Sequence, residues 1–237
     1  MNTMQATSSH PALDVDKARF NMIEQQVRPW DVADATVLSL LADIPREAFV
    51  PEAYRSLAFA DIDLPLTSPA VDGEHMLPPK VQARVAQDVA LQPTDTVLHI
   101  GTGSGYMAAL LGKQAKSVLS LEINPSLAAF AKANLQRVGI ANVDVRCADA
   151  AANGFKACEG QGPYDVIVLS GSVAEVPQTL LKLLKVGGRL SAIVGGEPVM
   201  RATLITRASD TAFATEQPWD YLAPRLKNFP QPSAFRF

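Results

Sequence analysis

Hydrophobic residues change their spacing along the chain near residue 92. Before this point apolar side chains recur at helical intervals, as at Phe20, Ile23 and Val27 and again over 37–41. Prolines divide this half into short helices, and we expect no regular element over 60–80. The pattern predicts a polar tail over 1–13, followed by an N-terminal helical extension over 14–91 that includes an irregular loop.

Beyond residue 92, short apolar runs alternate with helical patterns. Strands are predicted at 96–100, 117–121, 143–146, 166–169 and 190–194, and helices at 106–113, 125–138 and 176–184. Nearly continuous apolar strands separated by helices are typical of a parallel sheet covered on both faces. We therefore predict an α/β fold with a doubly wound, mostly parallel sheet over 92–237. Two later stretches, 203–205 and 219–222, are candidate antiparallel edge strands.

Composition and charge narrow the classes of function. Apolar residues make up 48% of the chain and charged residues 19%, enough for a sizeable core. The formal charge of -3 argues against a nucleic-acid partner. No apolar run approaches the ~18 residues of a membrane helix, and the first residues lack a signal-peptide pattern. The two cysteines and three histidines show no metal-ligand spacing, so we expect no metal. Two cysteines do not form a disulfide scaffold and suit a reducing compartment, so we expect a cytoplasmic protein with no membrane partner.

A glycine-rich turn lies between the first predicted strand of the sheet and its helix. It consists of Gly101, Thr102, Gly103, Ser104 and Gly105. Glycines at such a turn let the backbone approach a ligand closely, and the following helix presents free N–H groups. A dinucleotide-binding loop would place its third glycine at position 106, which is Tyr106. The turn therefore predicts a cofactor other than a nicotinamide or flavin dinucleotide.

Polar residues follow the neighbouring predicted strands at the same edge of the sheet, where ligands of such folds bind. Glu122 ends the second strand, and its carboxylate can accept hydrogen bonds from both hydroxyls of a ribose. Asp149 follows the third strand and can accept from an adenine amino group, although an Asp there also suits a turn or helix cap. With Ile123, Ala150 and Ser170, these acids predict an adenosine site.

The order of these motifs, continued by Tyr164–Val168 and the glycine pair at 187–188, resembles the class I S-adenosylmethionine-dependent methyltransferases. Upstream stretches at 22–26, 44–46, 49–51 and 64–66 resemble the amino-terminal half of protein-L-isoaspartate O-methyltransferases. This resemblance implies a Rossmann-like fold and S-adenosylmethionine as the cofactor. It also implies that the enzyme methylates the α-carboxylate of L-isoaspartyl residues in damaged proteins, a repair reaction.

Three positions depart from the pattern of that family. The family has a Thr-Ile-Ser segment in the loop before the glycine-bearing strand, and here Met76 stands near the expected serine. The family has an acidic residue in that strand, where this chain has His99. In a later loop the family has Gly-Asp-Gly, and this chain keeps the acid as Asp149 but has an alanine on each side of it. The first difference affects acceptor recognition. The other two predict weaker cofactor binding, because an imidazole supplies no negative charge to a cationic cofactor and the alanines add bulk beside Asp149.

Three polar residues, Thr67, Ser68 and His75, lie in the loop that the family uses to cover the acceptor. We take them as candidate catalytic residues, with ordinary loop polarity as the alternative. A carboxylate acceptor, with a pKa of roughly 3.5, is already ionised at neutral pH and needs no general base. Two other functions stay open at this point: a methyltransferase of the same fold with another acceptor, and a non-enzymatic protein that binds the cofactor.

Overall fold

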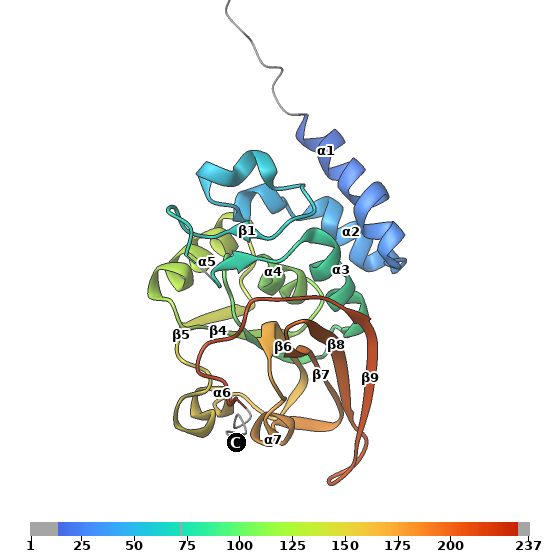
Figure 1. The fold of residues 1–237 in the computed structure, drawn as a ribbon, viewed down its shortest axis with the longest axis vertical. Helices are drawn as coiled ribbons and strands as arrows, with labels where there is room; N and C mark the ends of the chain where they lie inside the picture. Colours follow the sequence, from blue (N-terminus) through green and yellow to red (C-terminus); the bar gives the residue numbers. More distant parts are fainter. Residues whose placement is uncertain (1–13, 72, 232–237) are drawn as a thin grey trace, which may run out of the picture.

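A single mixed sheet forms the centre of the protein in the computed structural model, which describes residues 14–71 and 73–231. The predicted tail over 1–13 lies outside the described residues. The strands of this sheet are β3 (Thr96–Ile100), β4 (Ser117–Glu122), β5 (Val143–Cys147), β6 (Tyr164–Val173), β7 (Leu184–Gly196), β8 (Val199–Arg207) and β9 (Phe213–Asp220). Their order across the sheet is β5-β4-β3-β6-β7-β8-β9 (Figure 1).

The first five strands of the sheet are parallel, and β8 and β9 are antiparallel. This arrangement confirms the predicted α/β fold with a mostly parallel sheet. Of the two predicted edge strands, the one at 203–205 lies within β8. The one at 219–222 overlaps β9 only at residues 219 and 220, because β9 ends at Asp220. The helix predicted over 176–184 was wrong, because α7 spans only Gln178–Leu181 and Leu184 already pairs with Tyr164 in the sheet.

Helices cover both faces of the sheet. The helices that follow its strands are α4 (Tyr106–Gly112), α5 (Pro125–Arg137), the short turn η5 (Ala152–Gly154), α6 (Lys156–Glu159) and α7. Valines such as Val97 and Val166 point to the face covered by α4 and α5. Leu98 and Ile167, one position further along each strand, point to the face covered by α6 and α7. Apolar side chains on both faces explain why these strands read as continuous apolar runs.

The N-terminal extension packs over α4 and α5, on the same side of the sheet (Figure 1). Its elements are α1 (Val15–Met22), η1 (Ile23–Val27), η2 (Arg28–Trp30), α2 (Ala35–Asp43), η3 (Arg46–Phe49), η4 (Glu52–Leu57), β1 (Leu64–Pro65), β2 (His75–Met76) and α3 (Pro79–Asp88). Asp14 and Asp34 cap α1 and α2 by accepting from Lys17 N and Val37 N. Among the described residues, no helix has both the length and the apolar character to cross a membrane.

Within the extension, a fully buried arginine joins η3 to the loop before α3. Arg46 donates from Nε to the carbonyl oxygen of Ala58 and from Nη2 to that of Leu77, both at 2.8 Å, and it also bonds Gln82. Its guanidinium lies 4.9 Å from the ring centroid of Tyr106. Burial lowers the pKa of Arg46 to about 10, so the side chain stays charged at neutral pH. Arg46 thus fixes residue 77 against the helix that follows the glycine turn.

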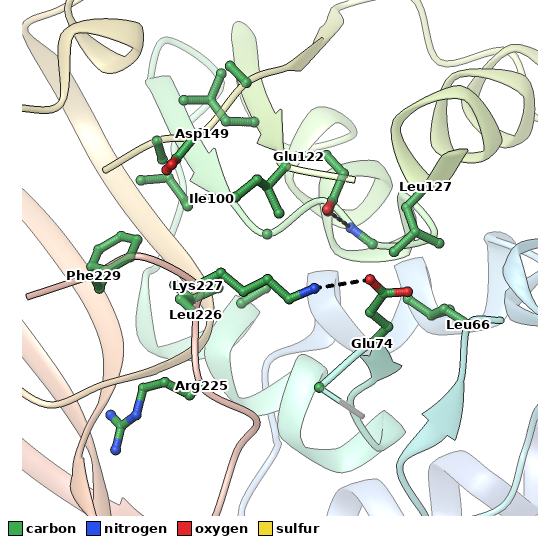
Figure 2. A pocket seen from close by; sticks show the side chains of 18 of the residues that line it. Leu66, Glu74, Ile100, Glu122, Leu127, Asp149, Arg225, Leu226, Lys227 and Phe229 are labelled. Carbon is green, nitrogen blue, oxygen red and sulfur yellow. Dashed lines mark hydrogen bonds and ion pairs between the residues drawn. The ribbon is translucent and has the colours of Figure 1, made fainter. Parts of the chain in front are cut away.

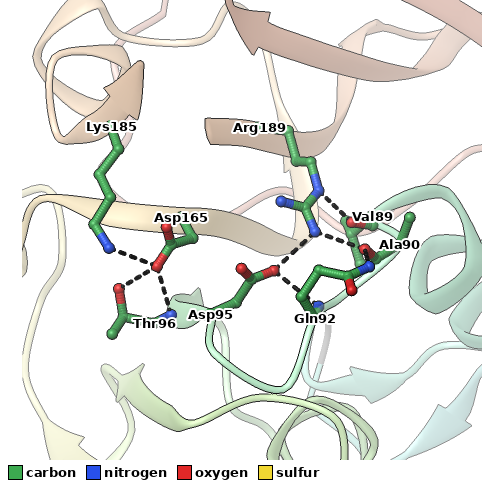
Figure 3. A network of polar contacts seen from close by, with 8 residues as sticks. All are labelled: Val89, Ala90, Gln92, Asp95, Thr96, Asp165, Lys185 and Arg189. Carbon is green, nitrogen blue, oxygen red and sulfur yellow. Dashed lines mark hydrogen bonds and ion pairs between the residues drawn. The ribbon is translucent and has the colours of Figure 1, made fainter. Parts of the chain in front are cut away.

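A polar network fixes the opposite, amino-terminal edge of the sheet (Figure 3). Asp165 Oδ2 accepts from the backbone N of Thr96 at 2.8 Å and from Lys185 Nζ at 2.7 Å. Arg189 bonds Asp95 at 2.9 Å and the carbonyl oxygens of Val89 and Ala90, just after α3. These contacts join β3, β6 and β7 to the helical extension and leave the carboxyl edge free for a site.

The segment after β9 returns across the carboxyl edge of the sheet toward α6 (Figure 1). The backbone N of Ser172 donates to Pro224 O at 2.7 Å, and Leu226 N donates to Ser172 O at 2.9 Å. Phe229 is buried, with its ring centroid 5.4 Å from that of Phe155. We call residues 223–229 the C-terminal strap.

Candidate functional site

A cavity lies where the carboxyl ends of β3, β4, β5 and β6 meet. Most of the residues predicted from the sequence as cofactor ligands line it, namely Gly101, Gly103, Glu122, Ile123, Asp149, Ala150 and Ser170. Because neighbouring parallel strands end at the same edge, residues that are far apart in the sequence come together here. The fold therefore brings both predicted acids and the glycine turn to one cavity.

The five residues of the glycine turn lie in different places. Gly103 has φ +55° and lines the cavity. Gly105 has φ +91° and does not line it; a Cβ there would lie 3.2 Å from the Cβ of Ala131, so this glycine lets α4 pack closely against α5. The side chains of Thr102 and Ser104 are buried, and neither residue is among those that line the cavity. Direct contact with a ligand in the cavity is thus limited to Gly101 and Gly103.

Each of the two acids already holds part of the backbone. Glu122 Oε2 accepts from Gly103 N at 2.7 Å (Figure 2). Its Oε1 accepts from Asn124 N at 3.0 Å. Asp149 Oδ1 accepts from Ala151 N at 2.9 Å, which is the turn-capping role considered as its alternative, and Oδ2 accepts from Asn228 at 2.7 Å. A carboxylate has about four lone-pair sites, so both acids can accept further hydrogen bonds from a ligand.

His99 lies beneath the cavity and is fully buried. Its Nδ1 is 2.8 Å from the hydroxyl oxygen of Ser120, and its Nε2 is 2.7 Å from that of Ser170. Burial lowers the pKa of His99 to about 3, so the imidazole is neutral at neutral pH. As the sequence predicted, this position supplies no negative charge to the site.

Residues from two distant segments form the roof of the cavity. Lys227 of the C-terminal strap reaches across to Glu74, with 3.2 Å between Nζ and Oε1 (Figure 2). Glu74 also accepts from Asn124 at 3.0 Å. Leu226 and Phe229 complete the roof. These residues were not predicted, because no motif marks them and 153 residues separate Glu74 from Lys227. The free space beneath the roof is about 90 Å³.

An open groove of about 620 Å³ adjoins the cavity. The cavity and the groove are both lined by His75, Arg225 and Lys227. Asp63 also lines the groove; burial raises the pKa of Asp63, although Tyr221 donates a hydrogen bond to it at 3.0 Å. Two cationic side chains, Arg225 and Lys227, and two acidic ones, Asp63 and Glu197, therefore line the groove.

The three candidate catalytic residues do not lie together. His75 lines both the cavity and the groove. Thr67 uses its hydroxyl oxygen to accept from Val71 N at 3.1 Å, and Ser68 is exposed. Neither is among the described residues that line the cavity or the groove, because both lie in the turn beyond β1. The placement of Thr67 and Ser68 therefore supports the alternative, ordinary loop polarity.

Comparison with known proteins assigns the chain to a family. The family model of protein-L-isoaspartate(D-aspartate) O-methyltransferase matches residues 18–220. The chain belongs to this family. Among its relatives, a protein-L-isoaspartate O-methyltransferase of Koribacter versatilis is 36% identical over 204 residues, which cover 86% of this chain and 87% of the relative. A second, from Marinobacter nauticus, is 38% identical over 201 residues, covering 84% and 88%.

Solved structures of the protein-L-isoaspartate O-methyltransferases share this fold. A structure of a putative member from Plasmodium falciparum, in complex with S-adenosyl-L-homocysteine, matches with a TM-score of 0.73 at 19% identity, covering 90% of this chain and 98% of that chain. Another member matches with a TM-score of 0.71 at 28% identity, covering 88% of this chain and 64% of that chain. These likenesses confirm the predicted class I methyltransferase fold.

Proposed function

We propose that the protein is an S-adenosylmethionine-dependent methyltransferase that methylates the α-carboxylate of L-isoaspartyl residues in damaged proteins. The observation that carries this proposal is the cavity at the carboxyl edge of the sheet, lined by the acids of two neighbouring strands in a chain of this family. The relatives bear the name of this activity, and the Plasmodium structure holds the product form of the same cofactor.

The lining of the cavity fits this cofactor. Glu122 would hold the ribose hydroxyls and Asp149 the adenine amino group, while Gly101, Gly103 and Ser170 would face the methionyl part. When bound, the cofactor supplies a methyl group activated by a positively charged sulfur. Small-molecule sites usually measure ~300–1,000 Å³, so the roof formed by Lys227 and Glu74 has to open before the cofactor enters its space of about 90 Å³.

The groove beside the cavity supports a carboxylate acceptor. Arg225 and Lys227 are cationic and line both spaces, whereas Asp63 and Glu197 line the groove alone. Arg225, and Lys227 once it separates from Glu74, would pair with the acceptor anion where the groove meets the cavity. An ionised carboxylate needs no proton removed before it attacks. The residues of the site then have to hold its oxygen about 3–3.5 Å from the methyl carbon and exclude water, which suits the apolar roof residues Leu226 and Phe229.

One observation favours a second candidate, a methyltransferase of the same fold with another acceptor. Met76 is 3% exposed and pairs with Leu64 in the β1–β2 hairpin, so it places a buried thioether near the position where the family has a hydroxyl. An acceptor that relies on that hydroxyl would be bound less well by this chain.

Methyl transfer to matched peptides tests the proposal. The protein is incubated with methyl-labelled S-adenosylmethionine and two peptides that differ only in an L-isoaspartyl or an L-aspartyl residue. We expect label on the isoaspartyl peptide alone, released by mild base as an ester is. Label on neither peptide but on components of a cell lysate supports the second candidate. Label on no acceptor, despite binding of the cofactor, contradicts both.

We also propose that the protein works in the cytoplasm and needs no metal, membrane or nucleic acid. Its cysteines, Cys147 and Cys158, are unpaired within the described part of the chain, which suits a reducing compartment. Residues 14–71 and 73–231 contain no group of three His, Cys, Asp or Glu side chains arranged to hold a metal. Methyl transfer is therefore expected to be unchanged by a metal chelator.

A further inference from the structure

Four side chains form a continuous row of hydrogen bonds beneath the cavity. The hydroxyl oxygen of Thr102 lies 2.7 Å from that of Ser120, which lies 2.8 Å from Nδ1 of His99. Nε2 of His99 lies 2.7 Å from the hydroxyl oxygen of Ser170. Thr102, Ser120 and His99 are each at most 3% exposed, whereas Ser170 is half-buried and lines the cavity. The row therefore begins in the core and ends at the site.

The imidazole can take part in this row in two ways, because a neutral imidazole has one N–H donor and one acceptor nitrogen. If Ser170 donated to Nε2, Nδ1–H would donate to Ser120, and the hydroxyl hydrogen of either Thr102 or Ser120 would then have no acceptor among the described residues. In the reverse direction Thr102 donates to Ser120, Ser120 to Nδ1, and Nε2–H to Ser170. All buried hydroxyl hydrogens are then used, and an unpaired buried donor is avoided.

The reverse direction leaves one hydrogen free, that of the Ser170 hydroxyl at the cavity wall. The sheet order β5-β4-β3-β6 places Asp149, Glu122, Gly101 and Ser170 in sequence along the carboxyl edge. With adenosine at Asp149 and Glu122, the methionyl chain extends toward Gly101 and Ser170. That chain carries one anion, its carboxylate, and a hydroxyl donor suits an anion.

We propose that Ser170 donates a hydrogen bond to the carboxylate of the bound methionyl chain and that His99, as its Nε2–H tautomer, is the positioning residue that orients Ser170. The inference rests on the placement of adenosine under the proposed function. Because His99 is held between two hydroxyls and stays neutral, it acts on the carboxylate through the Ser170 hydroxyl and not as a positive charge.

Binding of two product analogues tests the inference without any acceptor. Calorimetry compares S-adenosylhomocysteine with S-adenosyl-3-thiopropylamine, which keeps the ammonium group and lacks only the carboxylate. We expect Ser170→Ala to weaken binding of the homocysteine compound roughly tenfold, the worth of a hydrogen bond to a charged group, and to leave binding of the amine unchanged. Equal losses for both ligands, or no loss for either, overturn the proposal. Since no methyl is transferred, this outcome is independent of whether isoaspartyl peptides are substrates.

Two further measurements separate positioning from general damage to the fold. His99→Phe is expected to weaken binding of S-adenosylhomocysteine, and the double variant with Ser170→Ala to bind no worse than Ser170→Ala alone; additive losses contradict a role through Ser170. Ser191→Ala removes another buried serine, on β7 and outside the cavity lining, and should leave the ratio of the two affinities unchanged. If His99→Phe does not fold, nitrogen NMR of the wild-type imidazole decides the tautomer, and protonation at Nδ1 overturns the proposal.

Discussion

At the end of β4, the Glu122 carboxylate holds the backbone of the glycine turn and has lone pairs left for a ribose. We expect Glu122→Ala to weaken binding of S-adenosylhomocysteine by about 1–3 kcal/mol, because two ribose hydroxyls and two backbone amides lose their acceptor. Calorimetry measures the change. Glu216→Ala, an exposed acid on β9, is the matched control and should bind as the wild type does. Unchanged affinity of the Glu122 variant would show that the ribose lies elsewhere.

The buried imidazole of His99 predicts how stability depends on pH. Its pKa is about 3 in the folded protein against an ordinary value of 6.5, so below pH 6.5 the unfolded chain binds a proton that the folded protein does not. The stabilising effect of neutral His99 is complete above pH 6.5 and is lost as the pH falls toward 3, by at most about 1.4 kcal/mol per pH unit. Denaturant titrations should give His99→Gln a flatter pH dependence than the wild type. Parallel curves for the two proteins would contradict the assignment.

Single residues differ in how well the sequence predicts their role. Glu122, Asp149 and Ser170 were found because each follows an apolar strand, and strand ends of a parallel sheet meet at one edge. Glu74 and Lys227 were missed, since their contact depends on the path of the C-terminal strap, which no local pattern encodes. Gly105 was assigned to the ligand although its lack of a Cβ serves the packing of two helices.

Among the elements, the N-terminal extension depends on Arg46. We expect Arg46→Met to lower the free energy of unfolding by about 2–4 kcal/mol, since the carbonyl oxygens of Ala58 and Leu77 lose their buried donor. Urea titrations measure the loss. Arg55→Met changes an exposed arginine of η4 and should stay within about 0.5 kcal/mol of the wild type. Equal stability of the two variants would mean that Arg46 does not anchor the loop.

Every strand predicted in the core exists, and two of the three predicted core helices, at 106–113 and 125–138, match α4 and α5 to within one residue. The apolar runs at 96–100 and 117–121 lie within β3 and β4 because both faces of the sheet are covered. A helix was predicted over 176–184, but α7 spans only Gln178–Leu181 because Leu184 begins β7. The apolar pattern alone does not distinguish a buried helix from a buried strand over so short a stretch. The irregular region over 60–80 contains only two-residue strands before α3 begins.

At the scale of the whole molecule, the C-terminal strap and the loop before α3 meet over the cavity through Lys227 and Glu74. We expect Lys227→Met and Glu74→Gln each to speed the association of S-adenosylhomocysteine about two- to fivefold, the modest effect of an ion pair whose lysine is half exposed. Stopped-flow fluorescence measures the rate. Lys182→Met, an exposed lysine after α7, is the control. Slower association in both variants would indicate that the pair attracts the ligand and does not hold the roof closed.

The account depends most on where the nucleoside binds, and a crystal structure of the protein with S-adenosylhomocysteine measures this directly. It should place the ribose hydroxyls within hydrogen-bond distance of Glu122, the adenine amino group beside Asp149, and Lys227 separated from Glu74. A nucleoside bound outside the cavity, with the Lys227–Glu74 contact intact above an empty space, would contradict the account.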